Sequence, residues 1–132
     1  MQPKTTLTIA SIIGLIFSSA MFLAPEFVTR EQFPNSEGQG FADLVTLRYA
    51  IASLILALVI ISYHLRDITG HAFQIHVMRG YTLAFGVVCI TNLALQLTGK
   101  ISAVPPIVGT GVIAVLSLLT RRRLVSRTKE EA

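Results

Sequence analysis

The sequence predicts an all-α, polytopic membrane protein: a bundle of four transmembrane helices with both termini in the cytoplasm. Four apolar stretches, at residues 7–23, 44–63, 81–97 and 101–120, occupy most of the 132-residue chain. An α-helix rises about 1.5 Å per residue, so about 20 residues cross a hydrocarbon core of about 30 Å. Charged residues make up only 14% of the chain, against about 25% in soluble domains. A chain of this length has room for four spans and short loops but not for a second domain.

We therefore expect a single membrane domain over residues 1–132, with helices at about 5–24, 43–64, 79–98 and 102–121. The first apolar run is long for a cleaved signal peptide, so we expect it to be retained as a helix that ends before Pro25, where a proline cannot continue the hydrogen bonding. Ala10, Gly14 and Ser18 form a row of small residues on one face of this helix. Such a row lets two membrane helices approach closely, although small residues are common in membrane helices in any case.

The segments between the spans are short, and the longest, at about residues 25–43, is acidic. It carries turn-forming residues together with Phe27, Phe33 and Phe41, and these aromatics favour partial order over a fully solvated linker. Asp43 is a suitable N-cap for the second helix. The next connection is half apolar and is expected to lie along the membrane interface before the third helix starts near Arg79. The fourth helix opens at residues 105–106 with two prolines, which a helix tolerates in its first turn.

The orientation follows from the distribution of lysine and arginine around the span ends. Eight basic residues fall on one side of the predicted membrane and three on the other. The positive-inside rule then places both termini in the cytoplasm and the acidic loop outside. The majority side comprises Lys4, Arg66, Arg79, Arg121, Arg122, Arg123, Arg127 and Lys129. Because this basic tail follows directly on a membrane span, we expect it to set topology and to meet anionic lipid, and we expect no nucleic-acid partner.

Arg48 is the only aspartate, glutamate, lysine or arginine within the four apolar runs. An ionisable side chain in a span is costly unless it is paired or wetted, so it is a candidate for function. Arg48 could extend outward to the interface, or turn inward toward Glu26, at the end of the first helix, and Asn92 and Gln96, which share one face of the third helix. The inward arrangement has two interpretations: a structural clamp of interhelical hydrogen bonds, or an outward-facing pocket for a small ligand with Arg48 as counter-charge.

No residue pattern in the chain predicts a metal site, a cofactor or catalysis. Cys89 is the only cysteine and can form neither an internal disulfide nor a CxxC pair. His71 and His76 are five residues apart, which does not stack two ligands on one helical face. No nucleophile is paired with a base, so the sequence predicts a non-enzymatic protein without a cofactor.

The layout of the chain resembles the small bacterial four-helix membrane proteins of the DoxX-like group and its uncharacterised relatives. The points of likeness are Ala24–Pro25–Glu26 at the end of the first helix, Leu47–Arg48–Tyr49 in the second, Arg79–Gly80 before the third and arginines after the fourth. The resemblance implies a compact multi-pass bundle in the cell inner membrane. Some DoxX-like proteins are linked to thiol or quinone redox partners, and the single cysteine here offers no CxxC pair for a thiol role. Small multidrug exporters share the size, but they depend on a glutamate inside the first helix, and this helix has none.

Two functions follow from these observations. The first is a small non-enzymatic membrane protein that packs with a larger membrane complex, or with copies of itself, and stabilises the assembly. The alternative is a binder or carrier of a small amphiphile or quinone in an outward-facing cavity near Arg48. A cavity lined by Arg48 and its polar neighbours would favour the alternative, and a filled bundle with an exposed face of small residues would favour the first.

Overall fold

The structure, a computed structural model, describes residues 2–130, with side chains as far as Arg127, and this part of the chain is helical without a strand. Its helices are α1 (Pro3–Leu23), α2 (Pro25–Gln32), α3 (Gly38–Leu65), α4 (His71–Leu97) and α5 (Val104–Glu130). Four of them, α1, α3, α4 and α5, are long and apolar enough to cross a membrane. The prediction of an all-α protein with four membrane-spanning helices is therefore confirmed, and the chain is a multi-pass membrane protein.

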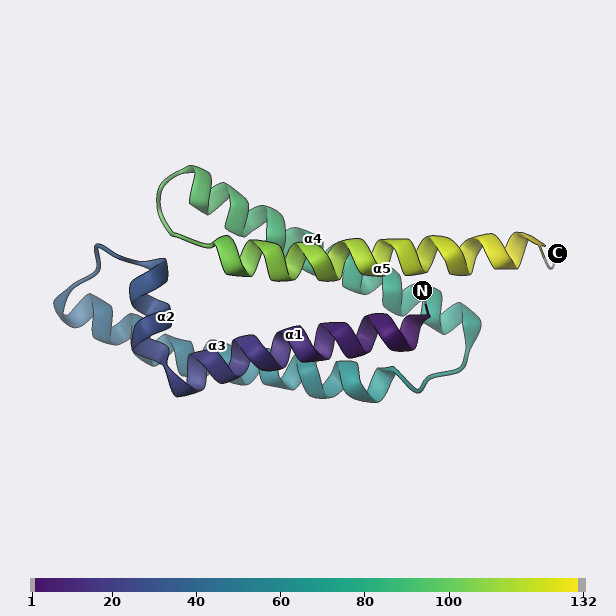
Figure 1. Ribbon diagram of the computed structural model, residues 1–132, viewed down its shortest axis with the longest axis horizontal. Helices are drawn as coiled ribbons and strands as arrows, with labels where there is room; N and C mark the ends of the chain where they lie inside the picture. The colour runs from purple at the N-terminus through teal and green to yellow at the C-terminus, as the bar shows by residue number, and fades with distance from the viewer. Residues whose placement is uncertain (1, 131–132) are drawn as a thin grey trace.

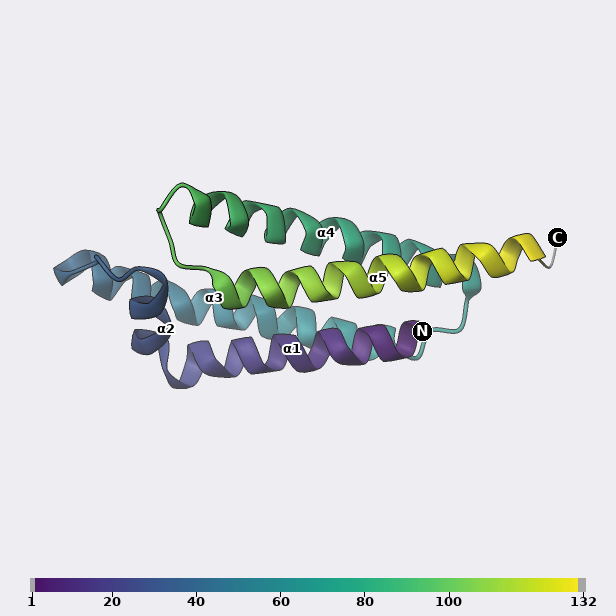
Figure 2. The same ribbon diagram turned by 45° about the horizontal axis from the view of Figure 1, so that its top comes forward.

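The four long helices form two antiparallel pairs, α1 with α3 and α4 with α5 (Figure 1). The pairs meet through α1 and α5, whereas the backbones of α3 and α4 lie apart although the two helices follow one another in the chain. Seen in cross-section, the order α3–α1–α5–α4 makes an open ring with its gap between α3 and α4. Figure 2 shows the same two pairs from a second direction, with α2 turned across one end of the bundle.

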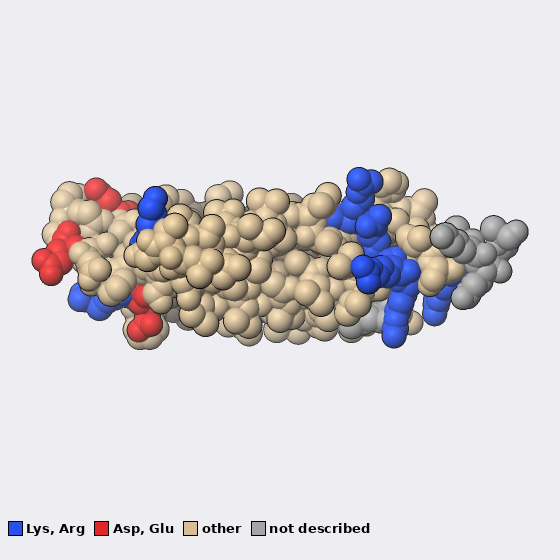
Figure 3. Space-filling model, turned by 90° about the horizontal axis from the view of Figure 1, so that it is seen from above, with Lys and Arg blue, Asp and Glu red and all other residues tan. Residues whose placement is uncertain are grey.

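Charged side chains collect at the two ends of the molecule and leave an uncharged band between them (Figure 3). We call the end that holds Lys4, Arg66 and Arg127 the basic end. The start of α1 and the end of α5 both lie there (Figure 1). The opposite, acidic end carries α2, with Glu26 in its first turn. An uncharged band between charged ends is what a bilayer requires of a spanning bundle.

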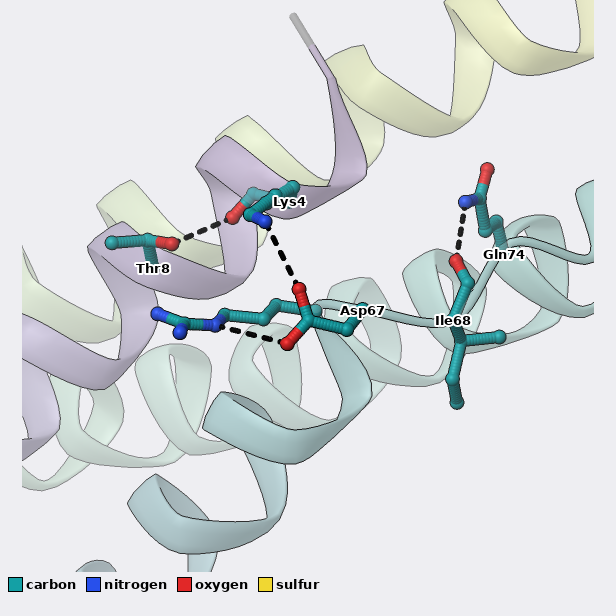
Figure 4. Close-up of polar contacts among 6 residues, drawn as sticks. Lys4, Thr8, Asp67, Ile68 and Gln74 are labelled. Carbon is teal, nitrogen blue, oxygen red and sulfur yellow. Dashed lines mark hydrogen bonds and ion pairs between the residues drawn. The ribbon is translucent and has the colours of Figure 1, made fainter.

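Side chains from all four long helices close the bundle at the basic end. Leu7 of α1, Met78 of α4 and Leu124 of α5 form a buried cluster, with Leu65 of α3 packed against it. Beside this cluster the hydroxyls of Thr6 and Thr120 share a hydrogen bond of 2.6 Å across the α1–α5 seam. The loop after α3 adds an ion pair, because Lys4 Nζ lies 3.0 Å from Asp67 Oδ1 (Figure 4).

Close approaches at glycines form the seams between the helices. A Cβ atom on Gly14 of α1 would lie 2.6 Å from the side chain of Val59 on α3, and one on Gly109 of α5 would lie 2.6 Å from the Phe17 ring on α1. Ser18 donates a hydrogen bond of 2.9 Å to the Ala52 carbonyl of α3. The small-residue row of the first helix therefore does bring two membrane helices close together, and both helices belong to this chain.

The predicted start of the second span was wrong. It begins at Gly38 rather than at Asp43. The φ of Gly38 is +57°, a conformation that glycine adopts at little cost, so the turn is completed there and the helix follows at once. Asp43 consequently lies inside the helix, where it accepts a hydrogen bond of 2.8 Å from Gln39 Nε2 and caps nothing.

Two further boundaries also differ. The segment expected to lie along the interface is instead the first two turns of α4, which starts at His71, because Met78 packs into the buried cluster of the basic end. The last helix runs on to Glu130 past its predicted end near 121, since arginine is a good helix former even where the apolar run has stopped. Its two prolines, Pro105 and Pro106, do fall in the first turn.

The acidic loop contains a helix that the prediction did not include, although partial order was expected there. Pro25 occupies the first turn of α2, where its missing N–H costs nothing. Glu26 lies in the first turn and Arg30 in the last, each with the sign that the helix dipole favours. These features allow a helix of eight residues to form across the acidic end.

Candidate functional site

A cavity of about 310 Å³ lies between the two helix pairs. Ligand-binding sites typically measure about 300–1,000 Å³ and are mostly apolar with a few placed polar groups. Most of the lining here is aliphatic or aromatic. Its polar members come from four helices and comprise Gln32, Arg48, Ser62, Asn92 and Thr110.

Arg48 projects from α3 into this cavity and is only 6% exposed. Its Nε donates a hydrogen bond of 3.3 Å to Thr29 Oγ1, and its guanidinium carbon lies 5.5 Å from the centre of the Phe33 ring. Its Nη2 is buried and has no hydrogen-bond partner among the described residues. Of the two orientations considered from the sequence, Arg48 therefore takes the inward one.

α2 positions the groups that hold Arg48. Thr29 donates its own hydroxyl proton to the Pro25 carbonyl over 2.7 Å, so its oxygen lone pairs face the guanidinium. Phe33 directly follows the helix and offers the π-face that attracts a cation. The end of α2 is fixed in turn by a hydrogen bond of 2.9 Å from the Ser102 amide to the Gln32 carbonyl. This bond links the first helix pair to the turn between α4 and α5.

The four residues proposed from the sequence do not form one cluster. Asn92 lines the cavity with Arg48, but its Nδ2 donates to the Val88 carbonyl of its own helix at 2.9 Å. Gln96 accepts a hydrogen bond of 3.2 Å from the Ala103 amide and so holds the turn between α4 and α5. Glu26 points outward and is exposed. Among the described residues, Asp67 forms ion pairs with Lys4 and Arg66 at the basic end, far from Glu26.

Sequence reasoning missed the lining residues Ser62 and Thr110. It also missed Thr29, Gln32 and Phe33, because they lie in a segment that was predicted to be a loop. A signal for them was present. Proline at the first position, glutamate next to it and arginine near the end mark a short helix over 25–32. In a helix, residues 29 and 33 lie on the same face. A predicted helix at this position would have indicated that both side chains face the second span.

The far end of the cavity is closed by neutral polar contacts. The hydroxyls of Ser62 on α3 and Tyr81 on α4 share a short hydrogen bond, and the Ser62 hydroxyl also lies 2.6 Å from the Leu58 carbonyl. The electrostatics of the cavity are therefore one-sided. The positive charge of Arg48 lies at the acidic end, and no charged residue lines the rest.

In the part of the chain that the structure describes, no three residues of the His, Cys, Asp or Glu type lie together as a metal site would need. Cys89 lies at the α4–α5 seam, where its Sγ is 3.5 Å from the Ile107 carbonyl. No protein-family model matches the chain, and no curated protein and no solved structure matches it. The resemblance to DoxX-like proteins thus stays a prediction, and function has to be argued from the cavity itself.

Proposed function

We propose that this protein binds a small amphiphile inside the bilayer, and that the polar end of the ligand accepts a hydrogen bond from Arg48. The polar end is a carboxylate, a phosphate-type oxyanion or a quinone-type carbonyl, all of which present an oxygen acceptor to a guanidinium. The observation that carries the proposal is the buried charge of Arg48, a residue that lines the cavity and whose Nη2 has no hydrogen-bond partner among the described residues.

The energetics support a ligand at this position. A buried charge that lacks a counter-charge is destabilising by several kcal/mol relative to a paired one, and within a membrane no bulk water compensates for it. Thr29 and Phe33 provide one neutral hydrogen bond and one π-contact. They leave Nη2 of the guanidinium without a protein acceptor, and an oxygen of the ligand would supply one.

The function expected first from the sequence, packing with a larger membrane complex, receives less support. That role was expected to show a filled bundle and an exposed face of small residues. The bundle instead contains a cavity, and Gly14 and Ser18 of the small-residue row are used inside the molecule against α3.

We further propose that the basic end faces the cytoplasm and that the membrane is the cell inner membrane. The excess of lysine and arginine at the end that holds both termini supports this orientation under the positive-inside rule. The resemblance to DoxX-like proteins supports the membrane. Arg48 and α2 would then lie toward the outer leaflet.

Native mass spectrometry of the protein in mild detergent tests the proposal. We would first look for co-purifying lipid or quinone, and then titrate the protein with oleic acid and with decylubiquinone. Replacing Arg48 by glutamine removes a charge-assisted hydrogen bond of about 1.5–3 kcal/mol, which corresponds to a loss of about 10- to 100-fold in affinity.

Arg30→Gln is the matched control. Arg30 also lies at the acidic end, in α2, but it is exposed, does not line the cavity and stacks on Phe41. The control variant should bind like the wild type. Equal occupancy of Arg48→Gln and wild type, or no binding of either probe to the wild type, would reject the proposal.

A further inference from the structure

The cavity has a side opening between α3 and α4. Leu58 of α3 and Val88 of α4 both line the cavity, yet they are 52% and 43% exposed on the outside of the protein. The backbones of the two helices lie apart, and their side chains meet at Ser62 and Tyr81, toward the basic end.

Every other side of the cavity is covered. The α1–α3 seam is closed at Gly14, the α1–α5 seam at Gly109, and the α4–α5 seam at Gly111, where a Cβ would lie 3.4 Å from Cys89 Sγ. The buried cluster around Met78 fills the basic end. α2 crosses the acidic end with Gln32 against the cavity.

The opening faces the uncharged band of the molecule. α3 exposes the aliphatic side chains Leu54 and Ile61, which lie four residues before and three residues after Leu58. Such a surface is suited to lipid chains and not to water. A solute that reaches the cavity by this route comes from the hydrocarbon layer of the membrane.

The shape of the cavity limits what it holds. Its lining extends along α3 from Arg48 to Ser62, which is about 21 Å of helix. The cavity is therefore elongated, with its one charged residue at one end, and an extended hydrocarbon chain with a polar head matches that arrangement.

We infer that the gap between α3 and α4 is a lateral portal through which a single-chain amphiphile passes from the bilayer into the cavity. Its oxygen-bearing end lies at Arg48, and its chain lies along Ile51, Ile55 and Leu58 toward Ser62. This inference rests on the proposed function, because it specifies how the ligand of that same cavity arrives and what kind of tail it carries.

A reversible staple across the portal tests the inference. Leu58→Cys and Val88→Cys are introduced together in a Cys89→Ser background and joined with bifunctional thiol reagents of increasing length that a reductant can release. The natural chain contains no tryptophan, so Phe85→Trp, at a residue that lines the cavity, provides a single fluorescent reporter. The probe is a fatty acid brominated on its tail, whose arrival quenches the tryptophan.

In vesicles, stapling should slow the quenching several-fold, and cleaving the staple in the same sample should restore it. Each single-cysteine variant treated with the same reagent is the control and should be slowed less. Native mass spectrometry with unlabelled oleic acid, before stapling and after release, establishes that the variant still binds. If it does not, Trp replaces Ile55 instead of Phe85 as reporter.

The outcomes separate the two proposals. Quenching that is equally fast with and without the staple would overturn the portal while leaving binding at Arg48 intact, and the ligand would then pass under α2. Absence of quenching in the unstapled protein, together with absence of a bound fatty acid in the wild type, would overturn the proposed function.

Discussion

Gly14 offers a sharp test of how the first helix pair is held together. A Cβ atom at this position would lie 2.6 Å from Cγ2 of Val59 and 3.7 Å from Cγ2 of Ile55. Non-bonded carbon atoms are most stable at about 3.5–4.0 Å. The methyl group of Gly14→Ala therefore fits against Ile55 but overlaps Val59 by roughly 1 Å relative to that optimum.

Two opposing effects decide the outcome of Gly14→Ala. Overpacking of this kind costs about 1–3 kcal/mol, whereas alanine is favoured over glycine in a helix by about 1 kcal/mol. Val59 is β-branched and has one strongly preferred rotamer in a helix, so its side chain cannot easily turn away from the new methyl group. The cost of overpacking should therefore lie in the middle of the range of about 1–3 kcal/mol or above it. We expect a net loss of about 1 kcal/mol.

Gly86→Ala is the matched control. Gly86 also lies inside a spanning helix, but a Cβ there would meet no atom within 4 Å. Only the gain in helix propensity applies, so this variant should be unchanged or more stable by up to about 1 kcal/mol. The two alanine variants should thus differ by about 1–2 kcal/mol, with Gly14→Ala the less stable of the two.

Unfolding in mixed micelles, followed by circular dichroism, measures these differences. The double variant Gly14→Ala with Val59→Ala removes the overlapping methyl group, and its stability should exceed the sum expected from the two single variants. If Gly14→Ala proves as stable as Gly86→Ala, the close approach of α1 to α3 does not exist as described, and the wall of the cavity formed by these helices would have to be redrawn.

Three further predictions concern the ends of the bundle. Alkaline phosphatase fused after the last residue should be inactive, and fused within residues 36–40 it should be active; the reverse pattern would contradict cytoplasmic termini. The hydrogen bond from Lys4 holds the pKa of the Asp67 carboxyl below its usual range. The ionised Asp67 therefore stabilises the fold above the ordinary aspartate pKa, and this stabilisation is lost as the pH falls through the lowered pKa. Thermal melts of wild type and Asp67→Asn should converge under acid conditions and not otherwise. Thr120→Val leaves the Thr6 hydroxyl without its partner and should destabilise the protein by about 0.6–1.7 kcal/mol in the same micelle assay, whereas Thr46→Val, at a hydroxyl that bonds only within its own helix, should cost less.

The spans were predictable because a bilayer imposes one length and one polarity on every helix that crosses it. The boundaries of the helices were less predictable, because they depend on tertiary contacts and backbone conformations that a hydropathy pattern does not report. Met78 makes its segment part of α4 by packing against Leu7 and Leu124, which are far away in the chain. Gly38 starts α3 through a backbone conformation rather than through a capping side chain.

Of the candidate site, the sequence predicted mainly Arg48, the residue whose burial costs the most free energy. A charge in a span has to be accounted for, so Arg48 could be named from the sequence alone. Its partners could not be named, because the segment that forms α2 was predicted to be a loop. That short helix carries Thr29 toward the guanidinium and leaves Glu26 facing outward, an arrangement which spacing along the spans does not reveal.

The contacts of Arg48 also have a consequence for the order in which the chain is built. Thr29 and Phe33 precede Arg48 in the sequence, and the helix pair α1–α3 is complete at Leu65. The most unfavourable residue of the protein thus meets its protein partners before α4 and α5 have left the ribosome. We expect the first 65 residues to be accepted by the insertion machinery on their own. The second hairpin, α4 with α5, then covers the other side of the cavity and leaves the gap between α3 and α4 as its opening.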